Sequence, residues 1–550
     1  MRALGKLLSH FLGFLWFAFV VALPLLGVWL ASSLVALAGG PRWLALTGGV
    51  LLFPVLPVWW EARAGAAWKK KQERLTRLTP PKPRRLTWVD RVVLRTLSLN
   101  LLFIAALLFT FPKVAFTALA TRGDWFLGDA DTPAARDTRK VLASVASGLE
   151  WLHEWANPNP YKTAADTPIA DAVAPTSSEA PTGDAWKRWR TPEDAGSGPR
   201  ADLAPSPLEA GADAGTTVTS LEADAGETGD FVFVVHPEGD VQQQQQQQQQ
   251  QPPPPPAEEL WRVGSTTWPQ ADTVHPAVAG MTASDERSIE AVARYLRSHT
   301  DDPFDRVKAL HDWVVTRLTY DEASVRGPRK PQDAETVFQS RTGVCEGYAR
   351  LMVELGRFSG DRIVYVTGEV REPNGQLAPV GHAWNAVEIH GAWYLLDATW
   401  DDPVVNGKSD RYQSDYLFIP PKLAAMDHFP DDERFQLLPA PLSRVDFLRQ
   451  PPGRPGLARQ GLVLVEPQAG AVDVRDVLAV TLENPRHINV MLAVSPEAGG
   501  AQLQCGVSDE AKVRLECQLP AAGRYTARLF TNKERYGTYG SVADFQVISR

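Results

Sequence analysis

Three long uncharged stretches stand out in the first 120 residues. The first lies between Lys6 and Arg42, the second runs from Trp43 to Trp60, and the third from Thr96 to Pro112. A helix needs about 20 mostly apolar residues to cross a bilayer. The pattern therefore predicts a membrane domain over residues 1–125, with three transmembrane helices at about 9–38, 43–60 and 94–118.

The first stretch has two alternatives to a membrane anchor. It could be a buried helix of a soluble core, since such helices are also apolar. It could also be a signal peptide, since Ala36-Leu37-Ala38 resembles a cleavage site. The apolar core of a signal peptide is typically about 7–15 residues long, and this stretch is longer. We therefore favour an uncleaved membrane anchor.

The net charge of −8 conceals two parts of opposite sign. Residues 1–120 hold 15 Lys and Arg against 3 Asp and Glu, and the rest holds 41 against 61. Many of the basic residues lie between Arg63 and Arg95, and short loops rich in Lys and Arg stay in the cytoplasm. With three crossings, this predicts a multi-pass protein of the cytoplasmic (inner) membrane whose later domains are extracytoplasmic. The acidic remainder argues against binding to nucleic acid.

Residues 126–257 have the composition of a disordered Ala/Pro/Gln-rich linker. Between 151 and 257 lie 15 of the 44 prolines, with few aromatic or branched apolar residues to form a core. The stretch ends in Gln242–Gln251 and Pro252–Pro256, of which the second favours polyproline II. The apolar patch Phe231–Val235 fits either a strand or a docking segment. We predict a spacer between the membrane and a folded part.

Helical periodicity marks the start of a domain over residues 258–445. Thr282 and Asp285 match a capping box ahead of an apolar-periodic segment. Pro303 suits the first position of a second helix, and Asp333 suits the cap of a third.

A cysteine lies where the next predicted helix begins. Gly343 permits a sharp turn, and Tyr348 is part of the apolar face that follows, so we expect Cys345 in the first turn. The positive end of a helix dipole stabilises a thiolate, the nucleophilic form of cysteine. A buried structural cysteine is the alternative for such a residue taken alone.

A predicted hairpin lies downstream of this cysteine. Two alternating stretches, 382–389 and 392–400, flank the turn-forming pair His390-Gly391. In the register that this turn sets, Asp397 is the diagonal neighbour of His382 on one face. The pattern thus predicts an imidazole and a carboxylate within hydrogen-bonding reach.

These three residue types make up a thiol-enzyme triad. Cys345 would attack an amide or acyl carbon, His382 would take the thiol proton, and Asp397 would orient the imidazole. Backbone N–H groups at the start of the cysteine helix are candidate oxyanion donors. Asp401 and Asp402 are less suited as the acid because they lie beyond the strand.

Three aromatic residues are tentative walls of a substrate groove. Trp384 and Trp400 adjoin the predicted histidine and aspartate, and Tyr348 follows the cysteine by three positions. Packing in the core is an equally good interpretation of the two tryptophans.

The motifs around these residues resemble the transglutaminase-like superfamily. The matching segments are Gly343-Val344-Cys345-Glu346-Gly347-Tyr348-Ala349, Gly381-His382-Ala383-Trp384-Asn385 and Leu396-Asp397-Ala398-Thr399-Trp400. Downstream, His428-Phe429-Pro430-Asp431-Asp432 is similar to the branch that contains the kyphoscoliosis peptidase and cytokinesis-related proteins. The resemblance covers about 285–440 and implies an α+β papain-like core with a triad on Cys345, His382 and Asp397.

The resemblance leaves the reaction open, because the family includes cross-linkers, deamidases, peptidases and inert binding modules. We expect a membrane-anchored thiol enzyme acting on protein or peptide amides outside the cytoplasmic membrane. The alternative is an inert tethered adaptor that binds partners through the same groove. The sequence has no acidic calcium loop, so we expect no metal and no other cofactor.

Regular short strands over residues 455–550 predict an accessory β-sandwich of the immunoglobulin-like kind. Cys505 and Cys517 bracket a predicted hairpin and could pair, which the chain-entropy model values at about 3 kcal/mol. The chain has 3 cysteines, too few for a disulfide scaffold, and this pairing leaves Cys345 as the odd one.

Overall fold

The computed structural model describes residues 2–40, 42–75, 86–127, 132–156, 158–162, 232–235, 261–372, 375–402, 404–405, 408–409, 412–451 and 453–550. They form two compact units, one of residues 1–158 with 444–448 and one of 159–443 with 449–550. The Gln and Pro tracts of the predicted linker lie outside the described residues.

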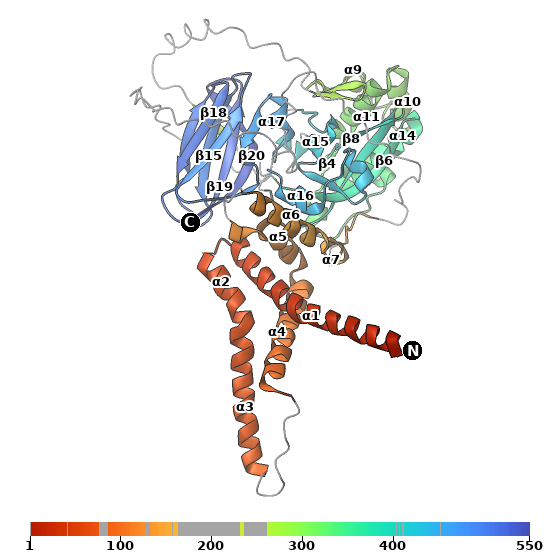
Figure 1. The fold of residues 1–550 in the computed structure, drawn as a ribbon. Helices are drawn as coiled ribbons and strands as arrows, with labels where there is room; N and C mark the ends of the chain where they lie inside the picture. The colour runs from red at the N-terminus through yellow and green to blue at the C-terminus, as the bar shows by residue number, and fades with distance from the viewer. Residues whose placement is uncertain are drawn as a thin grey trace, which may run out of the picture. The chain divides into compact units, whose positions relative to one another are not determined.

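The first unit is helical (Figure 1). Its helices are α1 (Arg2–Leu37), α2 (Arg42–Val50), α3 (Leu56–Leu75), α4 (Trp88–Thr110), α5 (Pro112–Arg122), α6 (Pro133–Ser147) and α7 (Glu150–Ala156). A π-turn, Leu51–Val55, joins α2 to α3, and a 3-10 turn, Trp125–Leu127, follows α5.

Two helical segments among the described residues are long and apolar enough to cross a membrane, rather than the three predicted. They are Trp16–Leu37 and Trp88–Thr110, each with a mean hydropathy of 2.2. The predicted helix at 43–60 is broken in the π-turn, where Phe53 leaves the helical region (φ −153°, ψ 117°) beside a proline. The predicted helix at 94–118 is also divided, because Pro112 begins a separate helix.

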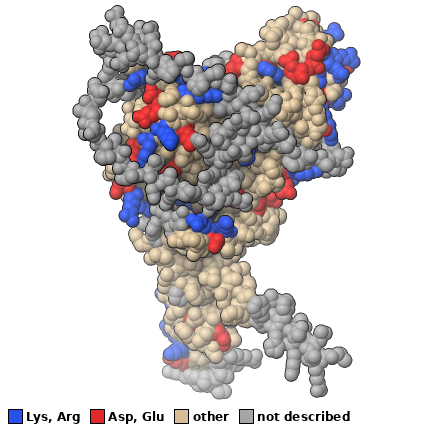
Figure 2. Space-filling view, turned by 45° about the horizontal axis from the view of Figure 1, so that its top comes forward, with Lys and Arg blue, Asp and Glu red and all other residues tan. Residues whose placement is uncertain are grey.

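The surface of these helices is strongly apolar. Phe17, Leu102 and Phe109 are 67%, 63% and 77% exposed. Figure 2 shows mostly uncharged surface over this unit, with basic side chains gathered near one end. Large exposed apolar surfaces mark sites of interaction, and on helices of this length they indicate association with a membrane.

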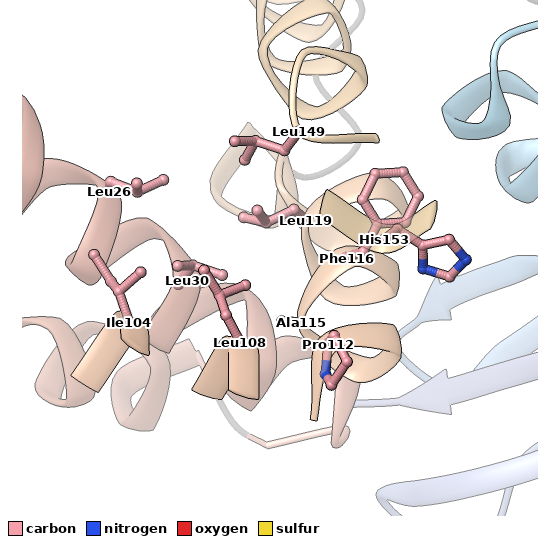
Figure 3. A pocket seen from close by; sticks show the side chains of 10 residues that line it. All are labelled: Leu26, Leu30, Ile104, Leu108, Pro112, Ala115, Phe116, Leu119, Leu149 and His153. Atoms are coloured by element: carbon pink, nitrogen blue, oxygen red, sulfur yellow. The ribbon is translucent and has the colours of Figure 1, made fainter. Parts of the chain in front are cut away.

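A small apolar cavity of about 40 Å³ lies among the helices of this unit (Figure 3). The ring of His153 on its wall lies 5.0 Å from that of Phe116, centre to centre. The walls carry no cysteine, serine or carboxylate, so the cavity does not resemble an active site. The lining residues are Leu26, Leu30, Ile104, Leu108, Pro112, Ala115, Phe116, Leu119, Leu149 and His153.

The linker prediction was wrong at its N-terminal end, because α6 and α7 lie inside residues 126–257. Thr132 caps α6, and the buried Ala135 and Ala146 pack against the unit. Arg444 lies 3.3 Å from a carboxylate oxygen of Glu150, which ties residues 444–448 to this unit. Composition alone obscured these helices because their amphipathic faces are short and rich in alanine.

The first part of the second unit is built on a five-stranded antiparallel sheet, in the order β11-β8-β7-β6-β12. Helix α14 packs on β6 and β7, and α10 and α11 pack on α14. The sheet strands are β6 (Arg362–Val370), β7 (His382–Ile389), β8 (Ala392–Leu396), β11 (Leu417–Ile419) and β12 (His428–Pro430). The principal helices are α10 (Ile289–Ser298), α11 (Pro303–Arg317), α13 (Ala334–Ser340) and α14 (Cys345–Ser359).

Shorter elements connect these. They are β2 (Trp261–Val263), β3 (Thr266–Trp268), α9 (Pro276–Ala279), β4 (Thr319–Tyr320), α12 (Glu322–Arg326), β5 (Thr342–Gly343), β9 (Val404–Val405), β10 (Lys408–Ser409), α15 (Pro421–Ala424), a 3-10 turn (Glu433–Gln436), α16 (Arg444–Arg449) and α17 (Pro455–Arg459).

Two of the predicted helix starts are confirmed and one is wrong. Pro303 is the first residue of α11, and Asp333 caps α13. Thr282 and Asp285 do bond to each other, with the Thr282 N–H 2.9 Å from the carboxylate, but they form a turn. Helix α10 begins later, at Ile289, and its cap is Ser288. The Ser288 side chain accepts a hydrogen bond from the backbone N–H of Ala291.

The predicted hairpin register is confirmed. His390 and Gly391 form the turn between β7 and β8 with φ of 54° and 78°, the left-handed region that such turns require. Asn385 consequently pairs with Leu396.

A β-sandwich follows, as predicted. One sheet has the order β1-β20-β19-β16-β17, with β14 beside β20, and the other has the order β13-β15-β18. Val232–Val235, the apolar patch left open between two interpretations, is strand β1 and pairs antiparallel with β20. A disulfide joins Cys505 to Cys517 and thereby links the two sheets. The remaining strands are β13 (Val463–Glu466), β14 (Ala471–Val474), β15 (Val477–Glu483), β16 (Asn489–Pro496), β17 (Leu503–Ser508), β18 (Lys512–Gln518), β19 (Gly523–Asn532) and β20 (Gly537–Ser549).

Candidate active site

Cys345 is the first residue of α14, as the sequence predicted. Its side chain is only 1% exposed. The Asn385 carboxamide donates to the carbonyl of Ala349 at 3.0 Å, which holds the start of α14 against strand β7. The helix that carries the thiol is therefore fixed to the strand that carries His382.

His382 and Asp397 meet across the hairpin. Nε2 of His382 lies 2.6 Å from Oδ2 of Asp397, and both residues are buried. The buried Cys345 lies beside this pair, since it packs with Ala383, the residue that follows His382. Since Nε2 is bonded to the carboxylate, Nδ1 is the ring nitrogen available to the thiol. The structure thus brings together all three residues predicted as a triad.

The electrostatics of this group favour the protonated form of His382. Burial by itself would lower the pKa of His382, but the charges of Asp397 and Cys345 outweigh it and raise the pKa to about 10. Burial would raise the pKa of Asp397, but His382 and a second histidine, His428, hold it well below its usual range. Asp397 is therefore a carboxylate, and His382 is protonated at neutral pH.

Both oxygens of Asp397 are held in place. Oδ1 accepts the backbone N–H of Thr399 at 2.9 Å and that of Trp400 at 3.4 Å. Oδ2, besides contacting His382, lies 3.1 Å from Nε2 of His428. The carboxylate has little freedom to rotate, so it can set the orientation of the His382 ring.

His428 also belongs to the site, although the sequence motifs did not predict its contact with Asp397. It lies on β12, and its Nδ1 is 2.7 Å from Oδ1 of Asp427. Tyr416 donates its hydroxyl to the other oxygen of Asp427 at 2.6 Å. A carboxylate at each ring nitrogen requires both nitrogens of His428 to carry protons, and the pKa of His428 is raised accordingly: burial opposes the charge, and Asp427 and Asp397 favour it.

The absence of a side chain at Gly368 helps His428 to reach Asp397. Gly368 on β6 lies between His382 on β7 and Pro430 on β12 in the sheet. A Cβ atom there would lie 2.5 Å from the Trp384 ring and 2.2 Å from the Phe429 carbonyl. The sequence offered one signal for His428, which is the pair Asp427-His428 at the start of the His-Phe-Pro segment that resembles the family. The sheet order that brings His428 to Asp397 depends on distant strands, so neighbouring residues do not predict it.

Asp401 and Asp402 lie in the turn beyond strand β8, as predicted, and both are buried. Asp401 accepts the Tyr416 backbone N–H at 3.0 Å and lies 3.2 Å from Nε2 of His311. Its pKa is raised to about 6, chiefly by burial. Asp402 accepts a hydrogen bond from the Tyr348 hydroxyl. These contacts fix the segment that follows Asp397.

The three tentative groove residues have different surroundings. Trp384 and Tyr348 are 3% and 1% exposed and belong to the hydrophobic core. Trp400 is half-buried, and its ring centre lies 5.5 Å from that of His382 and 4.5 Å from that of His428. Of the three, Trp400 alone remains a candidate for contact with a substrate.

His382, Asp397 and His428 are also the set that could hold a metal ion, since their ligand atoms lie within 4.8 Å of one another. Two histidines and a carboxylate suit zinc. Both imidazoles, however, direct Nε2 at the same carboxylate oxygen at 2.6 and 3.1 Å, which is hydrogen-bond geometry. A metal would require both nitrogens to lose their protons, against the raised pKa of each histidine.

Comparison with known proteins identifies a family and several relatives. Residues 290–398 match the model of the transglutaminase-like superfamily. The kyphoscoliosis peptidase of Mus musculus is 27% identical over 261 residues, and that of Homo sapiens is 28% identical over 264 residues. Each alignment covers 45% of this chain and 38% of the relative, so the chain spans under half the length of these curated relatives. The crystal structure of a TGase matches at 19% identity with a TM-score of 0.18, covering 22% of this chain and 34% of that chain.

Proposed function

Because residues 290–398 form a transglutaminase-like domain, we propose that this protein is a membrane-anchored thiol enzyme that acts on protein or peptide amide bonds. The observation that carries the proposal is the buried His382–Asp397 hydrogen bond of 2.6 Å, next to a helix whose first residue is Cys345 and which packs that cysteine against Ala383. A nucleophile, a base and a group that orients the base are the parts that thiol catalysis requires.

The proposed reaction follows from the positions of the protons. The reaction starts with the thiol proton already on Nδ1 of His382, and the thiolate of Cys345 adds to the carbon of an amide. Backbone N–H groups in the first turn of α14 would stabilise the resulting oxyanion. His382 then protonates the departing nitrogen, the C–N bond breaks and a thioester remains. Water or an amine, deprotonated by His382, resolves the thioester and restores the thiol.

Asp397 stays ionised throughout. Its carboxylate fixes the ring of His382 and stabilises the imidazolium before and after each transfer. The site supplies no preference between water and an amine as acceptor, so hydrolysis and acyl transfer both belong to the proposal.

We further propose that the catalytic domain lies outside the cytoplasm. Only the last crossing and the loop before it decide the side on which the rest of the chain emerges. The last candidate span is α4, and the residues before it include the basic side chains between Arg63 and Arg95. A cytoplasmic position for this loop places everything after α4 on the other side, whether two or three segments cross.

Turnover by the full-length protein in detergent or nanodiscs tests the catalytic proposal. Wild-type protein and the Cys345→Ala and His382→Ala variants are incubated with a library of glutamine-containing peptides, with and without a primary amine. Mass spectrometry separates hydrolysis, deamidation (+1 Da) and amine incorporation. Products formed by wild type and lost in both variants would support the enzyme.

The tethered adaptor remains the alternative, and thiol labelling distinguishes it. An activated Cys345 should react with iodoacetamide faster in wild type than in His382→Ala near pH 7. Equal rates, together with no turnover, would favour the inert adaptor. Protease added to intact spheroplasts tests the topology, and protection of residues 258–550 would refute the extracytoplasmic position.

A further inference from the structure

A short segment from the N-terminal side of the chain lies directly over the triad. Asn159 and Tyr161 belong to the second unit, although in sequence they follow the membrane helices. The Asn159 carboxamide donates to the carbonyl of Gly368 at 2.9 Å and to Asp431 at 3.2 Å. Its oxygen accepts the N–H of Tyr161 at 3.0 Å, which closes a turn that directs the next side chains.

The neighbour of His382 is shaped to receive this segment. A Cβ atom on Gly381 would lie 2.4 Å from the Asn159 side-chain oxygen, far inside van der Waals contact. Only glycine therefore allows Asn159 to approach so closely beside His382.

The side chain of Tyr161 fills a slot that leads to the nucleophile. It is 2% exposed and packs with Val344, Cys345, Ala349 and Ala383. Burial is the largest influence on the phenol and raises the pKa of Tyr161, so the hydroxyl keeps its proton.

The rest of the slot recognises general features of a peptide. The Arg329 guanidinium lies over the Tyr161 ring, 4.4 Å from its centre, as in a cation–π contact. The Tyr365 hydroxyl donates to the main-chain carbonyl of Tyr161 at 3.1 Å. The aromatic ring and the backbone carbonyl of Tyr161 are each matched by a separate group of the domain.

A nucleophile that is 1% exposed cannot meet a substrate while Tyr161 covers it. We propose that this slot is a binding subsite for a tyrosine-containing peptide, and that Asn159-Pro160-Tyr161 occupies it in cis and keeps the enzyme closed. The inference rests on the proposed function for its catalytic meaning. A peptide substrate with the same aromatic side chain would compete with the cis segment for the slot.

The test measures access to Cys345 in the full-length protein, by iodoacetamide alkylation followed by peptide mass spectrometry. Tyr161→Ala should raise the alkylation rate at least tenfold over wild type. Asn159→Ala, which releases the segment but keeps the tyrosine, should also raise it. Tyr295→Ala, a half-buried tyrosine on α10, is the matched control and should react at the wild-type rate.

Added peptide then tests the subsite itself. Acetyl-Asn-Pro-Tyr-Lys-amide at millimolar concentration should restore protection in Tyr161→Ala, and the same peptide with alanine in place of tyrosine should not. Unchanged alkylation in both variants would overturn the proposal. Faster alkylation without protection by the tyrosine peptide, or with equal protection by both peptides, would overturn the aromatic subsite. Thermal melts of the variants ensure that faster labelling does not come from unfolding.

These measurements need no turnover, so the two proposals fail separately. An unmasked and peptide-protected Cys345 without any product would refute the proposed enzyme but keep the subsite. Turnover with an unchanged alkylation rate would refute the subsite but keep the enzyme.

Discussion

Replacing Asp397 by asparagine should move the pH at which His382 loses its proton. The carboxylate is the first of the charges that raise the pKa of His382 to about 10, and burial acts in the opposite direction. Asp397→Asn keeps the shape of the side chain and removes its charge. Without this charge, less electrostatic attraction offsets the effect of burial, so the pKa of His382 should fall.

The size of the change can be worked from the same site. A pKa of about 10 against an ordinary 6.5 favours the imidazolium by on the order of 5 kcal/mol, at 1.36 kcal/mol per pH unit. Asp397 and Cys345 both contribute to it, and Asp397 is the larger of the two contributions. If the carboxylate supplies about half, the transition should move down by roughly two pH units. Loss of the group that orients the base should also lower kcat by roughly a thousandfold.

The assay is the rate of Cys345 alkylation between pH 5 and 11, with turnover measured in parallel. Wild type should show its alkaline transition near pH 10 and Asp397→Asn a transition at least one pH unit lower. Asp402→Asn is the matched control, since Asp402 is a buried carboxylate nearby that is bonded to Tyr348 and not to His382. An alkaline transition at the same pH in wild type and Asp397→Asn would refute the electrostatic account.

Three further outcomes are expected. His428→Phe removes charge-assisted hydrogen bonds to two buried carboxylates, each worth about 1.5–3 kcal/mol, so unfolding in urea should show a free energy of unfolding lower by roughly 3–6 kcal/mol. In the same variant kcat/KM should fall roughly tenfold or more, with little change in KM. The raised pKa of His382 stabilises the fold fully below about pH 6.5, and this stabilisation is lost as the pH rises through about 10. The lowered pKa of Asp397 stabilises the fold above about pH 4, and this stabilisation is lost in stronger acid. The melting temperature should therefore decline from about pH 7 to about pH 10, and a flat profile would contradict this. Replacing Cys505 and Cys517 together by serine should lower the stability of the sandwich by up to about 3 kcal/mol in denaturant without changing alkylation of the free cysteine.

The predicted triad residues were accessible from the sequence because the interactions that position them are local. The His390-Gly391 turn sets the register of β7 and β8, and the register determines that Asp397 lies beside His382. The place of Cys345 at a helix start depends equally on a few neighbouring residues. Backbone geometry over such short ranges is determined by the conformational preferences of neighbouring residues.

The membrane part was predicted less well, because an apolar run does not by itself specify a continuous helix. The run at 43–60 is long enough, but a backbone break at Phe53, just before Pro54, divides it. Apolar composition indicated where the long apolar helices lie, and the backbone decided how many of them are long enough to cross a membrane.

The sequence by itself determined the division into an apolar helical part, a transglutaminase-like domain and a sandwich, together with the three residues of the predicted triad. Only the tertiary structure brought His428 to Asp397, because these side chains meet through a sheet order that no local pattern encodes. It likewise placed Tyr161 on Cys345, from a segment whose composition resembled a linker. Contacts between distant parts of the chain depend on the packing of the whole unit, since their closure entropy is offset only when the surrounding core forms.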